Sequence, residues 1–188
     1  MDALLEQAVQ GMKKNGFEVV EVRTAAEACD YLLAHIAAEK SVGVGGSVSI
    51  RDTGVLPALA QKGCKVYTSW GAKPEDVPMI RENSRRADVY LSSANAVTRT
   101  GKLVLVDGTG NRVGAICDGP EEVYFVISHS KVVDGGINTA VARIKKTACP
   151  QNTRRLGIDT PCARTGNCGG DKCENSICLL YTSPSPRD

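Results

Sequence analysis

Aromatic residues are scarce in this sequence: Phe, Trp and Tyr together make up 4% of its 188 residues. Single-stranded nucleic acid is bound largely by stacking bases on such rings, so a chain with few of them is poorly suited to it. Charge of one sign is also lacking, because 23 basic residues stand against 21 acidic ones and the formal net charge is +2. We therefore expect no nucleic-acid partner, and a core of Val, Ile, Leu and Ala.

Long apolar runs are missing as well. The first residues, MDALLEQAVQGMKKNG, have an acid at the second position and no continuous apolar stretch. This pattern fits neither a secretory signal nor a membrane span. We expect a cytoplasmic protein without a membrane partner.

Cysteine, in contrast, is plentiful. Without an export signal, eight cysteines are not expected to form a disulfide scaffold, and five of them lie in the last forty residues. Their spacing matches neither the CxxC pairs of zinc ribbons nor the ferredoxin run. We expect four of them to bind zinc or an iron–sulfur cluster, because a segment rich in Gly and Asn has too little apolar surface to order itself. The alternative is a set of free or redox-active thiols. The expected ligands are Cys162, Cys168, Cys173 and Cys178, with Cys149 as the fifth thiol of the segment.

Helical and strand patterns alternate along the chain, which predicts an α/β domain over residues 1–148 with a mainly parallel sheet covered by helices. A loop-rich, Cys-rich segment is expected over 149–180. Residues 181–188 (YTSPSPRD) resemble a translated cloning adapter and are left out of the fold argument. We expect helices over residues 2–14, 24–40, 52–61, 75–86 and 134–147, the second of them opened by a Thr24-x-x-Glu27 capping box. Strands are expected over 17–22, 64–69, 88–91 and 122–128, and residues 41–47 are expected to form a short strand that runs into a glycine-rich turn. Residues 102–106 and 112–117 are expected to pair as a hairpin.

Two loops after expected strands carry small and hydroxyl-bearing residues. The first, residues 45–47, precedes an expected helix, an order in which backbone amides can turn toward a phosphate or carboxylate. It is neither a dinucleotide fingerprint nor a Walker loop, and a purely structural turn explains it equally well. The second, residues 92–101, is either a wall of a binding site or a polar connection. His129 also follows an expected strand, where ligands often bind. The candidate ligand-binding residues are Gly45, Gly46, Ser47, Ser93, Asn95, Thr98, Thr100, Gly101, Asp107 and Asn111.

Four motifs taken together resemble the LUD domain, the family of lactate utilisation proteins. They are Gly45-Gly46-Ser47, residues 94–98 (ANAVT), residues 106–113 (VDGTGNRV) and Gly119-Pro120. The resemblance implies a Rossmann-like open sheet, mainly parallel, with helices on both faces, similar to CoA transferases, ribose-phosphate isomerases and formyltetrahydrofolate cyclo-ligase. Such folds bind phosphorylated or carboxylated small molecules, so the implied ligand is a small anionic metabolite.

The same resemblance implies a function in lactate utilisation. In bacterial operons a LUD protein acts with iron–sulfur partners in oxidising L-lactate to pyruvate, and the stand-alone, Cys-tailed members are the most similar to this chain. Family members usually carry an acid in the Thr-x-x-Gly loop, where this sequence has Arg99. A carboxylate nucleophile is therefore not expected there. The alternatives are an acyl/CoA transferase- or isomerase-like enzyme of the same fold superfamily, and a metal- or redox-sensing binding protein.

Overall fold

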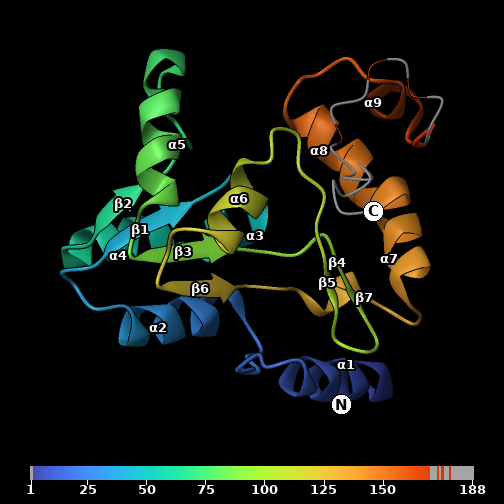
Figure 1. Cartoon of the computed structure of the whole chain (residues 1–188), viewed down its shortest axis with the longest axis horizontal. Coiled ribbons are helices and arrows are strands. Elements are labelled where there is room, and N and C mark those ends of the chain that lie inside the picture. The colour runs from blue at the N-terminus through green and yellow to red at the C-terminus, as the bar shows by residue number, and fades with distance from the viewer. Residues whose placement is uncertain (1, 170–172, 174, 176–177, 179–188) are drawn as a thin grey trace, which may run out of the picture.

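Four short apolar strands build the main sheet of the computed structural model, which describes residues 2–169, 173, 175 and 178. All neighbours in this sheet run parallel, in the order β2-β1-β3-β6 (Figure 1). The strands are β1 (Ser41–Val44), β2 (Lys65–Tyr67), β3 (Val89–Ser92) and β6 (Glu122–Phe125). The predicted α/β fold with a mainly parallel sheet is confirmed.

Successive side chains of β1 and β3 point to opposite faces of this sheet, and each face is covered by different helices. One face packs in a single core cluster with α2 (Ala25–His35) and α4 (Val55–Lys62). Gly43 alternates with these core residues and faces α5 (Val77–Arg85), where an added Cβ would lie 2.1 Å from the Ser84 carbonyl oxygen. The helices thus cover both faces, as the family resemblance implied. The core residues are Leu32, Ile36, Val42, Val44, Ile50, Val55, Leu56, Leu59, Cys64, Val89 and Leu91.

The Thr24 cap at the start of α2 forms as predicted, but the second bond of the capping box comes from the residue before the cap instead of from the Thr24 amide. Thr24 Oγ1 accepts a hydrogen bond from the Glu27 amide at 3.1 Å, and the Glu27 carboxylate accepts one from the Arg23 amide at 2.7 Å. The helix ends at His35 rather than at residue 40, because Ile36 adopts an extended conformation and is buried in the core. Within the described part of the chain, none of the helices combines the length and apolar character needed to cross a lipid bilayer.

Two of the expected strands are not formed. Residues 17–22 have no regular structure, and Phe17, Val20 and Val22 remain exposed on the surface. Residues 111–117 form helix α6 (Asn111–Cys117) instead of the second strand of a hairpin. Its first turn is stabilised by the Asp107 carboxylate, which accepts a hydrogen bond from the Val113 amide at 2.7 Å. The apolar pattern did not reveal this cap.

A hairpin does form, but residues 103–104 are its second strand and pair with a strand that precedes them in the chain. β4 (Ala96–Thr98) pairs antiparallel with β5 (Leu103–Val104), and β4 also pairs parallel with β7 (Val132–Val133). This second sheet, ordered β5-β4-β7, lies beside the first (Figure 1). The turn of its hairpin packs against α1 (Ala3–Lys14), because an added Cβ on Gly101 would lie 2.0 Å from the Met12 amide nitrogen.

A run of helices covers the second sheet. α7 (Ile137–Arg143) continues through a π turn, η3 (Ile144–Ala148), into α8 (Cys149–Arg155), and α9 (Pro161–Thr165) follows. Pro150 has no amide proton to offer the preceding turn, which accounts for the irregular bonding there. The expected start of the Cys-rich segment at residue 149 thus falls inside this run. Shorter elements are α3 (Val48–Arg51), η1 (Pro74–Asp76) and η2 (His129–Lys131).

Substitution of Gly101 tests the contact between the hairpin turn and α1. Gly101 and Gly71 both have a positive φ, +77° and +74°, but no atom lies within 4 Å of a Cβ added to Gly71. We expect Gly71→Ala to lower the free energy of unfolding by about 1–2 kcal/mol through backbone strain alone. Gly101→Ala should lower it by about 2–5 kcal/mol, since overpacking adds to the strain. Urea denaturation measures both changes, and equal losses would mean that the turn does not pack on α1.

Candidate functional site

The carboxyl ends of β1 and β3 lie where the strand order reverses, since β2 is on one side of β1 and β3 is on the other. Open α/β sheets bind ligands at such a switch point, because the loops that follow the two strands diverge there. Three segments reach this place: residues 45–49 after β1, which include the first residues of α3, Ser93 after β3, and the segment that leads from β6 into η2.

Lys131, at the end of η2, connects these loops. Its Nζ donates hydrogen bonds to Ser49 Oγ and Ser93 Oγ, both at 2.8 Å. Sequence analysis missed this residue; in this segment it noted only the nearby His129, which it did not include among the candidate ligand-binding residues and which is exposed. No sequence motif includes Lys131. The tendency of ligands to bind beyond the carboxyl ends of strands pointed to the segment after β6, but it did not single out the lysine side chain.

Positive charge accumulates around Lys131. Burial, and then the positive charges of the neighbouring Arg143 and Arg112, lower its pKa to about 8. Arg143 donates from Nη1 to the Asn95 carbonyl oxygen at 2.6 Å, and burial also lowers the pKa of its guanidinium. Among the described residues, no carboxylate lies within ion-pair distance of Lys131 or Arg143. Cations without acidic partners make this site favourable for an anion.

Arg112 holds the loops of the site in place. Its Nε donates to Asp107 Oδ1 at 2.8 Å, and its side chain and that of Asp107 are only 14% and 8% exposed. Nη1 donates to the Ser93 carbonyl oxygen at 2.9 Å, whereas Nη2 donates to Asn95 Oδ1 at 2.7 Å and to the Val106 carbonyl oxygen at 2.9 Å. All three guanidinium nitrogens are therefore engaged, and Arg112 positions the loops rather than binding a ligand.

A second group of cations borders the loop after β1. The guanidinium carbons of Arg51 and Arg155 lie 4.9 and 5.1 Å from the ring centroid of Trp70. Burial, and then Arg51, lowers the pKa of Arg155. A Cβ added to Gly46 would lie 3.7 Å from Arg155 Nη2. The exposed Gly46 therefore lies next to positive charge that comes from α8.

The predicted residues near the switch point have differing roles. Ser47 is buried and its Oγ accepts a hydrogen bond from the Ile50 amide at 3.3 Å, so the hydroxyl caps α3. Gly45 packs closely, since a Cβ there would lie 2.9 Å from the Tyr90 hydroxyl oxygen. Gly45 and the exposed Asn111 line one small hollow, on the side of α5 and α6.

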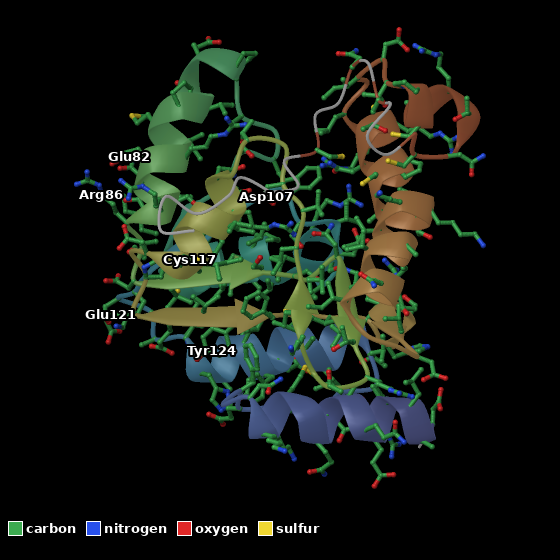
Figure 2. All side chains as sticks on the ribbon, turned by 45° about the vertical axis from the view of Figure 1, so that its right-hand side comes forward. Glu82, Arg86, Asp107, Cys117, Glu121 and Tyr124 are labelled. Carbon is green, nitrogen blue, oxygen red and sulfur yellow. The ribbon has the colours of Figure 1, made fainter. Side chains whose placement is uncertain are left out.

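Asn95 and Asp107 line a second small hollow, whose other walls include Cys149 and Cys178. Figure 2 labels Asp107 between the α6 side of the molecule and the helices α7 and α8 opposite. This hollow brings the loop that contains Asn95 next to the cysteine segment.

The remaining predicted residues lie away from Lys131. Thr98 Oγ1 accepts a hydrogen bond from the Lys102 amide at 3.0 Å and lies 3.1 Å from Thr100 Oγ1, so both hydroxyls stabilise the turn of the hairpin. Gly101 completes this turn against α1. Arg99 is exposed and pairs with Asp134 at 3.3 Å. The structure therefore divides the predicted loop of residues 92–101: only its first part reaches the switch point.

The cysteine segment brings several thiols into the cluster that covers the second sheet. Cys149 and Cys162 are buried in this cluster with Ala96, and Cys168 and Cys178 pack against it. Cys173 is half-buried, and among the described residues it does not belong to the cluster. Cys149 Sγ and Cys178 Sγ lie 3.4 Å apart.

The thiols of Cys149 and Cys178 have opposite pKa shifts. The hydrogen bond with Cys178, and then burial, raises the pKa of Cys149, whereas the bond with Cys149 lowers the pKa of Cys178 to about 7. Within the described residues, no three Cys, His, Asp or Glu side chains are already close enough together to hold a metal ion.

Comparison with known proteins identifies the family of the chain. A family model described as LUD domain matches residues 5–188, a range that includes the switch point and the cysteine segment. No match was found among curated proteins or among solved structures.

Replacing Arg112 tests its role in holding the loops. We expect Arg112→Met to lower the free energy of unfolding by about 3–5 kcal/mol, because it leaves the buried Asp107 carboxylate without its partner. The matched control is Arg86→Met, which removes an exposed ion pair with Glu82 and should cost less than about 1 kcal/mol. Urea denaturation at neutral pH measures both losses. Similar values for the two variants would show that Arg112 does not organise the site.

Proposed function

Because the chain belongs to the LUD domain family, whose function is associated with lactate utilisation, we propose that it binds a small carboxylate at Lys131. In this proposal it acts in the cytoplasm as a subunit in the oxidation of L-lactate to pyruvate, and iron–sulfur partner proteins accept the electrons. The observation that carries the proposal is the ammonium of Lys131, held between Ser49 and Ser93 without a carboxylate partner among the described residues.

The hydrogen bonds of Lys131 leave capacity for a ligand. An ammonium group has three donors, and two of them point to Ser49 and Ser93. The third is available to a carboxylate oxygen, which would receive a charge-assisted hydrogen bond. Because Arg143 is also without an acidic partner in the described part of the chain, a bound anion would reduce the repulsion between the two cations.

The shape of the fold supports the same location. Ser49 belongs to the segment after β1 and Ser93 to the segment after β3, so Lys131 lies between the two strands where the order reverses. Arg155 adds positive charge beside Gly46, in the loop after β1, whereas Arg51 is paired with Asp52. A small acid whose polar end points to Lys131 fits this arrangement better than a nucleic acid does, since the cations are partly buried.

An enzyme of the same fold superfamily is the second candidate, and the lowered pKa of Lys131 favours it. An amine with a pKa of about 8 is partly neutral at slightly alkaline pH and can then serve as a base or nucleophile. Turnover of an acyl-CoA, or of lactate with an electron acceptor, by the purified protein alone would favour this candidate. Activity that requires iron–sulfur partners would favour the subunit.

The variant Lys131→Met separates binding from folding. In the unchanged protein, lactate or pyruvate at about 100 times its Kd should add about 2.7 kcal/mol to the stability. We expect the variant to lose this increase and to be at least as stable as the parent without ligand at pH 7, because it no longer buries an unpaired cation. Lys102→Met, at an exposed position, should keep the full response. Thermal-shift titrations measure both effects, and a full response of Lys131→Met would refute the site.

The affinity should depend on pH through Lys131. Its charge is complete well below pH 8 and is lost above it, so we expect a constant Kd for lactate below about pH 7 and a rise of up to about tenfold per pH unit above about pH 8, which levels off above the higher pKa of the complex. The folded state has the lower pKa, so this group makes the unliganded protein more stable as the pH rises from about 8 toward the ordinary value of 10.5. Calorimetric titration across pH 6–10 (roughly the window of this shift) measures the first effect. A Kd that does not change across this range would contradict the assignment.

A further inference from the structure

The cysteine segment contains a group of thiols that the proposed carboxylate site does not use. We infer that Cys149, Cys162, Cys168 and Cys178 form a tetrathiolate site for one soft divalent cation such as Zn²⁺. The ligand set differs in one member from the set expected from the sequence, because the structure places Cys149 in the cluster and Cys173 outside it. Cys149 belongs to the folded body of the protein, at the first position of α8.

The distance between two of the sulfurs supports a single ion. Cys149 Sγ and Cys178 Sγ lie 3.4 Å apart. Thiolates that share one tetrahedral zinc ion lie roughly 3.8 Å apart, since each Zn–S bond is about 2.3 Å long. A disulfide would bring the sulfurs to about 2.05 Å. In a [4Fe–4S] cluster each thiolate binds a different iron, so the sulfurs lie further apart.

Buried hydroxyl groups surround a third sulfur. Thr160 and Thr153 are each 1% exposed, and their Oγ1 atoms lie 3.3 and 3.5 Å from Cys162 Sγ. Thr160 Oγ1 already accepts a hydrogen bond from the Ala163 amide, so its own proton can point to the sulfur. A hydroxyl that donates to a ligand sulfur is a common outer contact of metal sites and stabilises the thiolate form.

Apolar residues surround two of the thiols, and the adjustment needed is small. Ala96, Ala140 and Ile144 are buried in the same cluster as Cys149 and Cys162. The described thiols are not yet at ligand distances as a set of three or more, but rotation about χ1 moves a sulfur by roughly 3 Å. One M²⁺ ion reacts with four thiols to form one tetrathiolate complex, and the four thiol protons are released to solvent.

Matched serine variants test the ligand set. The full chain is purified anaerobically with a reductant and without chelators, and is then titrated with Zn²⁺ against a chelator and with Co²⁺ for its thiolate charge-transfer absorption. We expect about one ion per chain for the parent and for Cys173→Ser. Cys149→Ser should bind Zn²⁺ at least about tenfold more weakly and should lose part of the Co²⁺ absorption.

A measurement on the unmutated chain protects the test against a variant that fails to fold. Zn²⁺ should shield Cys149, Cys162, Cys168 and Cys178 from alkylation while Cys173 stays reactive, as read by peptide mass spectrometry. Loss of binding in Cys173→Ser with normal binding in Cys149→Ser would overturn the inference. It would also be overturned by iron and sulfide with a broad band near 400 nm (about the usual position for thiolate-bound iron), or by reduced thiols that bind no metal.

Discussion

The guanidinium of Arg112 is the interaction on which the arrangement of the site depends. It joins four groups from two segments, residues 93–95 and 106–107: the Asp107 carboxylate, the Asn95 side chain and the carbonyl oxygens of Ser93 and Val106. Without it, the loop after β3 would have buried carbonyl groups to satisfy and a buried carboxylate to neutralise. The family motif in residues 106–113 therefore has a physical explanation, since its acid and its arginine form this pair and its acid also caps α6.

Lys131 contrasts with Arg112, because the protein compensates one cation internally and leaves the other without an acidic partner among the described residues. A fold selected only for stability would not keep a partly buried ammonium beside Arg143 without a counter-charge. Residues that lower the stability of the fold in this way are typical of functional sites. It is the physical reason for placing the ligand at Lys131 rather than at the glycine loop, where the hydroxyl of Ser47 is already used as a helix cap.

The sequence predicted the parallel sheet well because its strands are short, apolar and separated by helices with recognisable caps, as at Thr24. It failed at residues 112–117, where an apolar run that looks like a strand forms a helix because the nearby Asp107 carboxylate, which was read as part of a hairpin turn, caps it. At the site, glycine and hydroxyl patterns located the loops after β1 and β3. They did not identify Lys131, whose environment arises only when the segment after β6 meets both loops. Neither did spacing reveal that Cys149 would join the tail cysteines, since that depends on how α8 packs.

The separation of Lys131 from its two serines has a consequence for the order in which the chain assembles. Its partners lie 82 and 38 residues earlier in the sequence. A nascent chain that has left the ribosome only as far as β6 already contains the strands of the main sheet and the Arg112 clamp, but not the cation. The loops and the arginine that holds them are therefore all synthesised before Lys131, so the hydrogen bonds that join them do not depend on this cation. Anion binding as proposed above would require a chain that extends past residue 131.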